Sequence, residues 1–253
     1  MPTPTHHPSH VPPLEDKAIY VQSMFARIAG RYDLLNDLMT AGRHRYWKRV
    51  AARAAEPAGA VALDLGAGTG DIARQLVHLG AREVVAADFV PEMLAPAVER
   101  ATREGVTNLR FAVADALALP FADESFDCVT SGFLVRNVTD QEQAFREMCR
   151  VLRPGGRVVC LEASRRDGLV GYVLSVGFGV VARLLGQIIA RDKDAYAYLP
   201  DSAAAFASPA ELAETMRRAG FTAIQYRTFG LGLIAIHRAR RPDVGRDSSR
   251  LTT

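Results

Sequence analysis

A buried strand that runs straight into a glycine-rich turn constrains this chain more than any other feature. Residues 61–65 form a short apolar run, and Gly66, Gly68 and Gly70 follow at alternate positions. Glycine lets the backbone turn sharply and lets a nucleotide-like ligand approach it closely. A helical pattern begins at Asp71, so the segment is predicted to fold as strand, turn and helix. This order is typical of a parallel sheet that binds a ligand at its strand ends.

The alternation of strand and helix continues along the chain. Further apolar runs typical of strands occupy 83–87, 109–114, 126–130 and 157–161, and helical patterns occupy 71–79, 141–152 and 211–219. Another helix begins near Pro91, where Pro96 is expected to kink it or shift its start. Pro154-Gly155-Gly156 is expected to stop the helix before the fifth strand. Residues 221–227 and 231–238 complete the pattern as two strands joined around Gly230. We therefore expect an α/β fold with a mostly parallel seven-stranded sheet, helices on both faces and a C-terminal antiparallel hairpin.

One domain is expected between two polar tails. Residues 1–15 contain five prolines and residues 240–253 are polar, so we expect both ends to be disordered. Residues 16–239 then form a single domain, in which residues 16–55 make an N-terminal helical cap. The N-terminus lacks the pattern of a signal peptide, and no apolar run reaches the length of about 18 residues that a membrane span needs. We expect a cytoplasmic protein.

Bulk composition argues against several classes of function. The formal net charge is only +3, which predicts no nucleic-acid partner. Cys128, Cys149 and Cys160 lie far apart and form no CxxC pair, so we expect buried, reduced thiols and no metal site.

Acidic residues around the glycine-rich turn favour a cationic ligand over a dinucleotide. Asp64 precedes the turn, and Asp71 occupies the position where a dinucleotide fingerprint has its last glycine. A carboxylate there would repel the pyrophosphate of NAD, whereas S-adenosylmethionine (SAM) has no phosphate and carries a sulfonium and an ammonium group. Asp88 ends the second strand, where it suits ribose hydroxyls, and Asp115-Ala116 ends the third, where it suits adenine.

These residues predict one SAM site at the carboxyl ends of the strands. The simpler interpretation of each Asp is that it caps the helix after it, but acids at successive strand ends converge on one crevice. We predict cofactor contacts from Asp64, Gly66, Gly68, Thr69, Gly70, Asp88, Phe89, Asp115, Ala116 and Gly132.

Over roughly residues 20–240, the chain resembles the ubiquinone/menaquinone biosynthesis C-methyltransferase family. The matching segments are residues 24–25, 29–37, 42–49, 63–71, 115–116, 119–121, 136–140, 198–202 and 235–238. The glycine-rich part is common to most SAM methyltransferases, whereas the segments at 31–37, 136–139 and 198–200 are more specific. The resemblance implies a Rossmann-like class I SAM-dependent methyltransferase fold.

Several positions depart from the family pattern. Gly66-Ala67-Gly68-Thr69-Gly70 replaces Ala-Gly-Gly-Thr-Gly, and Gly132-Phe133-Leu134-Val135 replaces Ser-Phe-Gly-Leu. Residues 161–164 lack the family Phe, and residues 191–194 replace a Gly-Asp turn. These changes leave SAM binding intact and leave the acceptor open.

The resemblance implies methyl transfer to a ring carbon of a polyprenylated quinol, namely demethylmenaquinol to menaquinol in respiratory quinone biosynthesis. Such a carbon is nucleophilic when a neighbouring hydroxyl loses its proton. Arg136 is predicted to stabilise the phenolate, Asn137 to orient the ring oxygen, and Tyr32 and Asp33 to contact the acceptor. The alternative for Arg136 is a surface ion pair, and His237 is either a base or a structural histidine.

The uncharged stretch at 168–182 is too short to span a bilayer. It fits a core or lid helix, and it also predicts peripheral contact with the inner face of a membrane. Other functions remain open: a SAM-dependent O- or N-methyltransferase of a soluble small molecule, or a non-catalytic SAM-binding protein. A naphthoquinol or benzoquinol ring, the tail length and a homodimer are open as well.

Overall fold

Seven strands form a single mixed sheet in the computed structural model, which describes residues 12–166, 168, 171, 176–177, 179–181 and 193–243. The strands are β1 (Val61–Leu65), β2 (Glu83–Asp88), β3 (Leu109–Val113), β4 (Phe126–Gly132), β5 (Leu152–Ala163), β6 (Thr222–Phe229) and β7 (Ile234–Arg240). Their order is β3-β2-β1-β4-β5-β7-β6, and β7 alone runs antiparallel to its neighbours. The predicted α/β sheet with an antiparallel C-terminal hairpin is confirmed.

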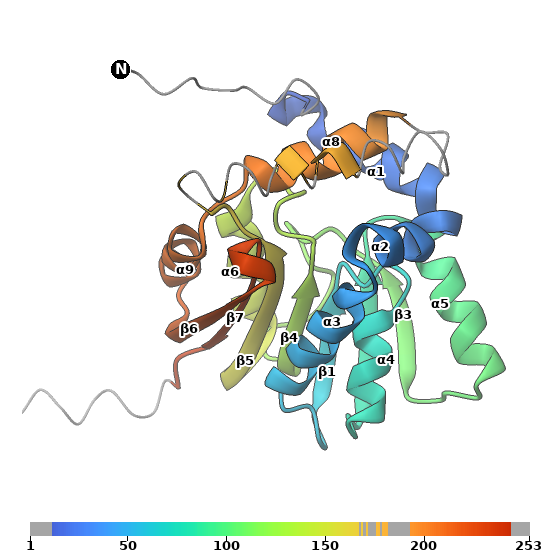
Figure 1. The fold of residues 1–253 in the computed structure, drawn as a ribbon. Coiled ribbons are helices and arrows are strands. Elements are labelled where there is room, and N and C mark those ends of the chain that lie inside the picture. The colour runs from blue at the N-terminus through green and yellow to red at the C-terminus, as the bar shows by residue number, and fades with distance from the viewer. Residues whose placement is uncertain are drawn as a thin grey trace, which may run out of the picture.

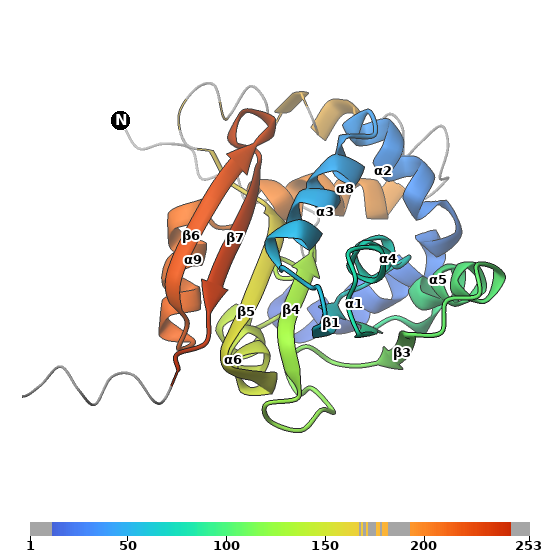
Figure 2. The ribbon, with the colours of Figure 1, turned by 90° about the horizontal axis from the view of Figure 1, so that it is seen from below.

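Helices cover both faces of the sheet (Figures 1 and 2). One face carries α3 (Arg43–Ala54), α4 (Asp71–His78) and α5 (Pro91–Arg103), and the other carries α6 (Gln141–Val151) and α9 (Pro209–Arg218). The capping box of α9 is complete, because the side chain of Ser208 accepts from the Glu211 backbone N–H and the Glu211 side chain accepts from the Ser208 N–H. Both faces of the central strands are therefore buried, as a parallel sheet requires.

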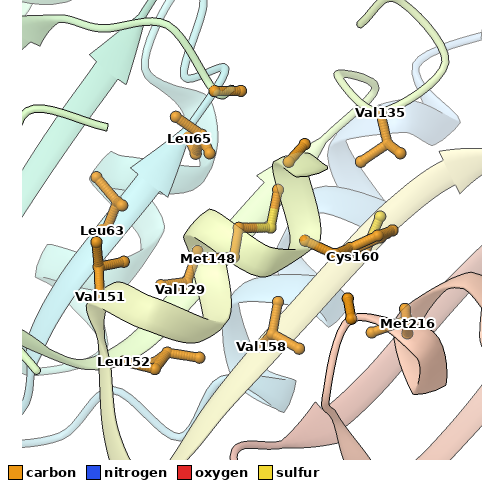
Figure 3. Close-up of a cluster of buried hydrophobic side chains, with 14 of the residues drawn as sticks. Leu63, Leu65, Val129, Val135, Met148, Val151, Leu152, Val158, Cys160 and Met216 are labelled. Atoms are coloured by element: carbon orange, nitrogen blue, oxygen red, sulfur yellow. The ribbon is translucent and has the colours of Figure 1, made fainter. Parts of the chain in front are cut away.

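The apolar face of α6 packs on β1, β4 and β5 (Figure 3). Met148 and Val151 of the helix lie over Leu63, Val129 and Val158, and all of these side chains are fully buried. Burying a side chain of this size stabilises a fold by about 1.5–3 kcal/mol. This packing aligns the carboxyl ends of the parallel strands at one edge of the sheet.

A helical cap lies over that edge (Figure 1). It consists of α1 (Leu14–Ile28), the short 3-10 helix η1 (Ala29–Arg31), α2 (Tyr32–Thr40) and α8 (Lys193–Ala204). Met24, Phe25 and Ile28 of α1 are buried against Met93 of α5 and Tyr198 of α8. The cap therefore has its own apolar core, which joins its N-terminal part to a helix from late in the chain. Among the helices of the described residues, none is long and apolar enough to cross a membrane.

Three elements differ from the sequence prediction. Helix α5 starts at Pro91 and continues through Pro96, so Pro96 does not shift its start. Strand β5 begins directly after α6, at Leu152, and Pro154-Gly155-Gly156 lies where the β4–β5 pairing shifts register. The glycines and proline thus interrupt the strand pairing instead of separating helix from strand. Helix α8 was not predicted, because Pro200 within it is normally a helix breaker. Most of the apolar stretch at 168–182 lies outside the described residues.

Candidate active site

A cavity opens between the carboxyl ends of the strands and helix α1. Its volume is about 840 Å³ including the open space at its mouth, which lies in the range of small-molecule sites. Most of the predicted cofactor residues line it, namely Gly66, Gly68, Asp88, Phe89, Asp115, Ala116 and Gly132. Asp64, Thr69 and Gly70 are not among the lining residues, although they belong to the same turn.

The glycine-rich turn follows β1 in a conformation that favours glycine. Gly66, Gly68 and Gly70 have φ angles of 69°, 55° and 81°, in the left-handed region. Asp88 at the end of β2 holds this turn, because its Oδ2 accepts from the Gly68 N–H at 2.8 Å and its Oδ1 from the Val90 N–H at 2.9 Å. Burial raises the pKa of Asp88, and these backbone hydrogen bonds oppose the shift. Asp88 also lines the cavity, so a ligand there can reach its carboxylate.

Asp64 points into the protein interior. Its Oδ2 accepts from the Ala73 N–H at 2.9 Å and its Oδ1 from the Thr130 hydroxyl at 2.8 Å. The carboxyl thus joins β1 to the first turn of α4 and to β4, and it is fully buried. Burial raises the pKa of Asp64 to about 7.

Asp71 also faces away from the cavity. Its Oδ2 accepts from Lys48 Nζ at 2.7 Å, and Arg100 lies 3.6 Å from its other oxygen. Burial would raise the pKa of Asp71, but these cations hold it below its usual value. The charge that we expected to attract a cationic ligand is therefore neutralised within the protein. That step of the sequence argument was wrong, because Lys48 lies far away in the sequence.

Asp33 joins the cap to the same turn. Its Oδ1 accepts from the Thr69 hydroxyl at 2.6 Å, and Arg100 lies 3.4 Å from its Oδ2. Asp33 was expected to contact the acceptor, but it does not line the cavity, whereas its neighbour Tyr32 does.

Asn137 lines the cavity, whereas Arg136 lies buried beside it and is not among the lining residues. Arg136 forms an ion pair with Glu162 of β5, so the ion pair expected at the surface is in the interior. The Asn137 Nδ2 group donates to the Phe133 carbonyl at 3.0 Å, and its Oδ1 accepts from the Tyr198 hydroxyl at 3.2 Å. Arg136 also lies over the Phe133 ring, with its guanidinium carbon 5.4 Å from the ring centroid.

Sequence reasoning missed two charged partners of this segment. Glu162 is fully buried, and its signal was an acid within the otherwise apolar run at 158–163. Lys17 of α1 donates from Nζ to the carbonyls of Arg136 and Val138, both at 2.9 Å. Helix α1 of the cap and strand β5 therefore both bind the turn after β4, α1 through Lys17 and β5 through Glu162.

His237 has a structural position. Its Nε2 lies 2.8 Å from the Pro209 carbonyl at the start of α9, and its ring packs against Tyr226. It is fully buried and does not line the cavity. The described residues hold no cluster of His, Cys, Asp and Glu that could bind a metal ion, and their three cysteines are free.

Comparisons with known proteins show which family has this sequence. The model of the ubiE/COQ5 methyltransferase family matches residues 14–241. The chain belongs to this family. It is 46% identical to the demethylmenaquinone methyltransferase of Roseiflexus castenholzii, covering 90% of this chain and 95% of that protein. It is also 46% identical to the enzyme of the same name from Thermus thermophilus, covering 87% of this chain and all of that protein.

A solved structure supports the fold of this family member. A SAM-dependent methyltransferase from Aquifex aeolicus has a TM-score of 0.60 at 16% identity, and covers 82% of this chain and 97% of that chain. The chain is thus a methyltransferase with a class I fold, and SAM is its cofactor. The prediction of an enzyme is confirmed, and the alternative of a non-catalytic SAM-binding protein is wrong.

Asp64→Asn should make the stability of this methyltransferase less dependent on pH. Asp64 has a pKa of about 7 in the folded protein, compared with about 3.9 in an unfolded chain. Between these values the folded state holds a proton that the unfolded state has lost, so the free energy of unfolding of the wild type falls as pH rises. As the pH rises through this window, we expect the free energy of unfolding of the variant to increase relative to that of the wild type by up to about 1.4 kcal/mol per pH unit.

Urea unfolding at about pH 5, 6 and 7 measures this difference. An Asn side chain can still accept from Ala73 and donate to Thr130, so the variant keeps both contacts. Glu92→Gln, which removes an exposed carboxyl at the start of α5, is the control. Parallel pH profiles for the wild type and Asp64→Asn would contradict the raised pKa.

Proposed function

We propose that this methyltransferase transfers the methyl group of SAM to a ring carbon of a polyprenylated quinol, with demethylmenaquinol as the acceptor. The division of the cavity into two sides carries this proposal. Glycines and the acids Asp88 and Asp115 line the side of the strand ends, whereas Ala18, Val21 and Phe25 of the cap line the other side. A polar cofactor suits the first side, and an isoprenoid quinol suits the second. The names of the relatives from Roseiflexus and Thermus support this acceptor.

The strand order suggests how SAM lies in the cavity. Asp88 with Phe89 ends β2, where the free lone pairs of the carboxylate suit the ribose hydroxyls. Asp115 and Ala116 follow β3, where they suit the adenine ring. The methionine part then lies along the turns after β1 and β4, beside Gly66, Gly68 and Gly132. In this arrangement Asp64, Thr69 and Gly70 do not contact SAM, and they fix the shape of the glycine-rich turn from the side away from the cavity.

The reaction itself is an in-line displacement. The ring carbon forms a bond with the methyl group as the bond from methyl to sulfur breaks, and the sulfonium becomes the neutral thioether of S-adenosylhomocysteine. The same ring carbon then loses its proton, and the aromatic ring is restored. The protein supplies alignment and exclusion of water, and the apolar cap over the cavity supports both roles.

A cation near the ring oxygen would make the carbon more nucleophilic. We propose that Arg136 stabilises the developing phenolate, while Asn137 and Tyr32 hold the ring. Arg136 is buried and does not line the cavity, so we propose that its charge acts on the ring oxygen electrostatically, beside Asn137, and not through a direct hydrogen bond. Glu162 and Tyr198 hold Arg136 and Asn137 in position.

Asp88→Ala should weaken binding of S-adenosylhomocysteine by about 1.5–3 kcal/mol, because the ribose loses a charged hydrogen-bond acceptor. Asp88→Asn keeps one acceptor oxygen and should lose less. Isothermal titration calorimetry measures both, with Asp123→Ala as a control that removes an exposed carboxylate outside the cavity. Wild-type affinity in Asp88→Ala would contradict the proposed cofactor position.

Incubation with SAM and a tail-shortened demethylmenaquinol tests the acceptor directly. We expect one new carbon–methyl bond for each S-adenosylhomocysteine formed, detected by NMR. The double variant Arg136→Met/Glu162→Gln removes both buried charges together, so neither is left unpaired. We expect it to bind S-adenosylhomocysteine normally and to lose about 10²–10³ in kcat, as for loss of one oxyanion-stabilising donor.

Two controls accompany this assay. Glu162→Gln alone keeps the cation and should retain more activity than the double variant. Thermal unfolding of each variant shows that the fold is intact. An O-methyl ether as product, or no product from the wild type, would contradict the proposed reaction, and an unchanged kcat in the double variant would contradict the role of Arg136.

We also propose peripheral contact with a membrane, as an isoprenoid acceptor would require. Val176, Val180 and Val181 are exposed, as are Ile19 of α1 and Leu34 of α2 in the cap. Co-sedimentation with vesicles of phosphatidylcholine and phosphatidylglycerol should show binding that falls in Ile19→Ser/Leu34→Ser. Val98→Ser, which changes an exposed apolar side chain on α5 outside the cap, should bind as the wild type does. Equal sedimentation of all three proteins would contradict contact through the cap.

A further inference from the structure

Gly66 and Leu134 lie against each other, at the turns that follow β1 and β4. Both residues line the cavity. A Cβ atom at position 66 would lie 2.8 Å from Leu134 Cβ, and 3.1 and 3.2 Å from its two Cδ atoms. The Cβ atom of Leu134 cannot rotate away, because its position is set by the backbone. The Leu134 side chain therefore fits here only because residue 66 has none.

The other glycines of the cavity have more tolerant neighbours. A Cβ atom on Gly68 would meet only the end of the Met93 side chain, at 3.3 Å. One on Gly132 would meet the terminal Cδ1 atom of Ile72, at 2.6 Å. Terminal atoms of flexible side chains can move by rotation about a χ angle. Steric dependence on Leu134 is thus specific to position 66.

The position of this contact in the sheet decides which part of the site it shapes. Ribose and adenine are assigned to the ends of β2 and β3, so the reactive methyl group lies toward β1 and its other neighbour, β4. Leu134 follows β4 and precedes Asn137 in the cavity wall. It therefore borders the space where the methyl group meets the acceptor ring.

We propose that Leu134 is a specificity-determining residue, which together with Gly66 sets the width of the cavity at the methyl-transfer end and so limits the size of the acceptor ring. The acceptor part rests on the proposed function, whereas the size match between the two residues does not. Leu134 forms this part of the cavity wall, and it fits there because Gly66 has no side chain.

Binding of S-adenosylhomocysteine tests the size match without any acceptor. Gly66→Ala should weaken binding by about tenfold, through overlap and through backbone strain at its positive φ. Leu134→Gly alone, which also removes the Cβ atom, should change binding by less than about threefold. Gly66→Ala/Leu134→Gly should recover about fivefold of the loss, because the overlap between the two Cβ atoms is gone. A double variant as weak as Gly66→Ala would overturn the size match.

Gly68→Ala is the matched control for this cycle. Gly68 has a similar φ of 55° compared with 69° for Gly66, but its Cβ would not meet Leu134. Leu134→Gly should therefore give no rescue of Gly68→Ala. Rescue of both glycine variants would overturn the proposal, since it would show a general loosening of the site.

Acceptor selectivity of Leu134→Ala tests the second part, and it does not depend on whether Gly66→Ala folds. The two probes are a tail-shortened demethylmenaquinol and the same quinol with one added methyl group on its second ring. One extra methyl group in a filled apolar pocket is worth about tenfold or more in kcat/KM. We expect the wild type to show this discrimination and Leu134→Ala to reduce it by about threefold or more, with little change in the KM for SAM.

The two measurements fail in distinguishable ways. An unchanged selectivity ratio in an active Leu134→Ala variant would overturn the specificity role. If the wild type methylates neither quinol, the proposed acceptor is wrong, and the role of Leu134 in selecting it falls with it. The binding cycle with S-adenosylhomocysteine still decides whether Gly66 and Leu134 are matched in size.

Discussion

The active site depends on one glycine-rich turn, and two buried carboxyl groups hold that turn in place. The glycines after β1 have left-handed backbone angles, which the local sequence permits but does not enforce. Asp64 fixes the turn from behind through the Ala73 N–H and the Thr130 hydroxyl. Asp88 fixes it from the ligand side through the Gly68 N–H. Both carboxyls lose solvation when they are buried, and the hydrogen bonds offset part of this cost.

Other buried charges tie separate parts of the chain to this turn and to its neighbour after β4. Lys48 pairs with Asp71 below the glycine-rich turn, and Glu162 pairs with Arg136 after β4. A charge removed from water is costly unless a partner of opposite sign lies close to it. Each pair therefore fixes the relative positions of the elements that carry its two members. Arg136 is held rigidly for this reason, which suits a group that stabilises charge during a reaction.

Much of the fold was predictable, because strands buried in a parallel sheet must be apolar and therefore appear in the sequence as short apolar runs. The runs at 61–65 and 83–87 became β1 and β2, since a buried parallel strand must be apolar on both faces. Helix α8 and the start of β5 were not predictable in this way. Pro200 and Pro154 are breakers in isolation, and only packing on the cap and pairing with β4 overcome their local preference.

Residue types and their order by themselves determined the glycine-rich turn and the acids at successive strand ends. The direction in which each acid points was decided only by the tertiary structure. Asp88 faces the cavity, whereas Asp64 and Asp71 turn toward partners on other elements. The contact between Gly66 and Leu134 was also decided by the tertiary structure, because these two residues are far apart in the chain and meet only when β1 and β4 pair side by side. A sequence records which side chains are available, but three-dimensional packing and desolvation select the partner of each one.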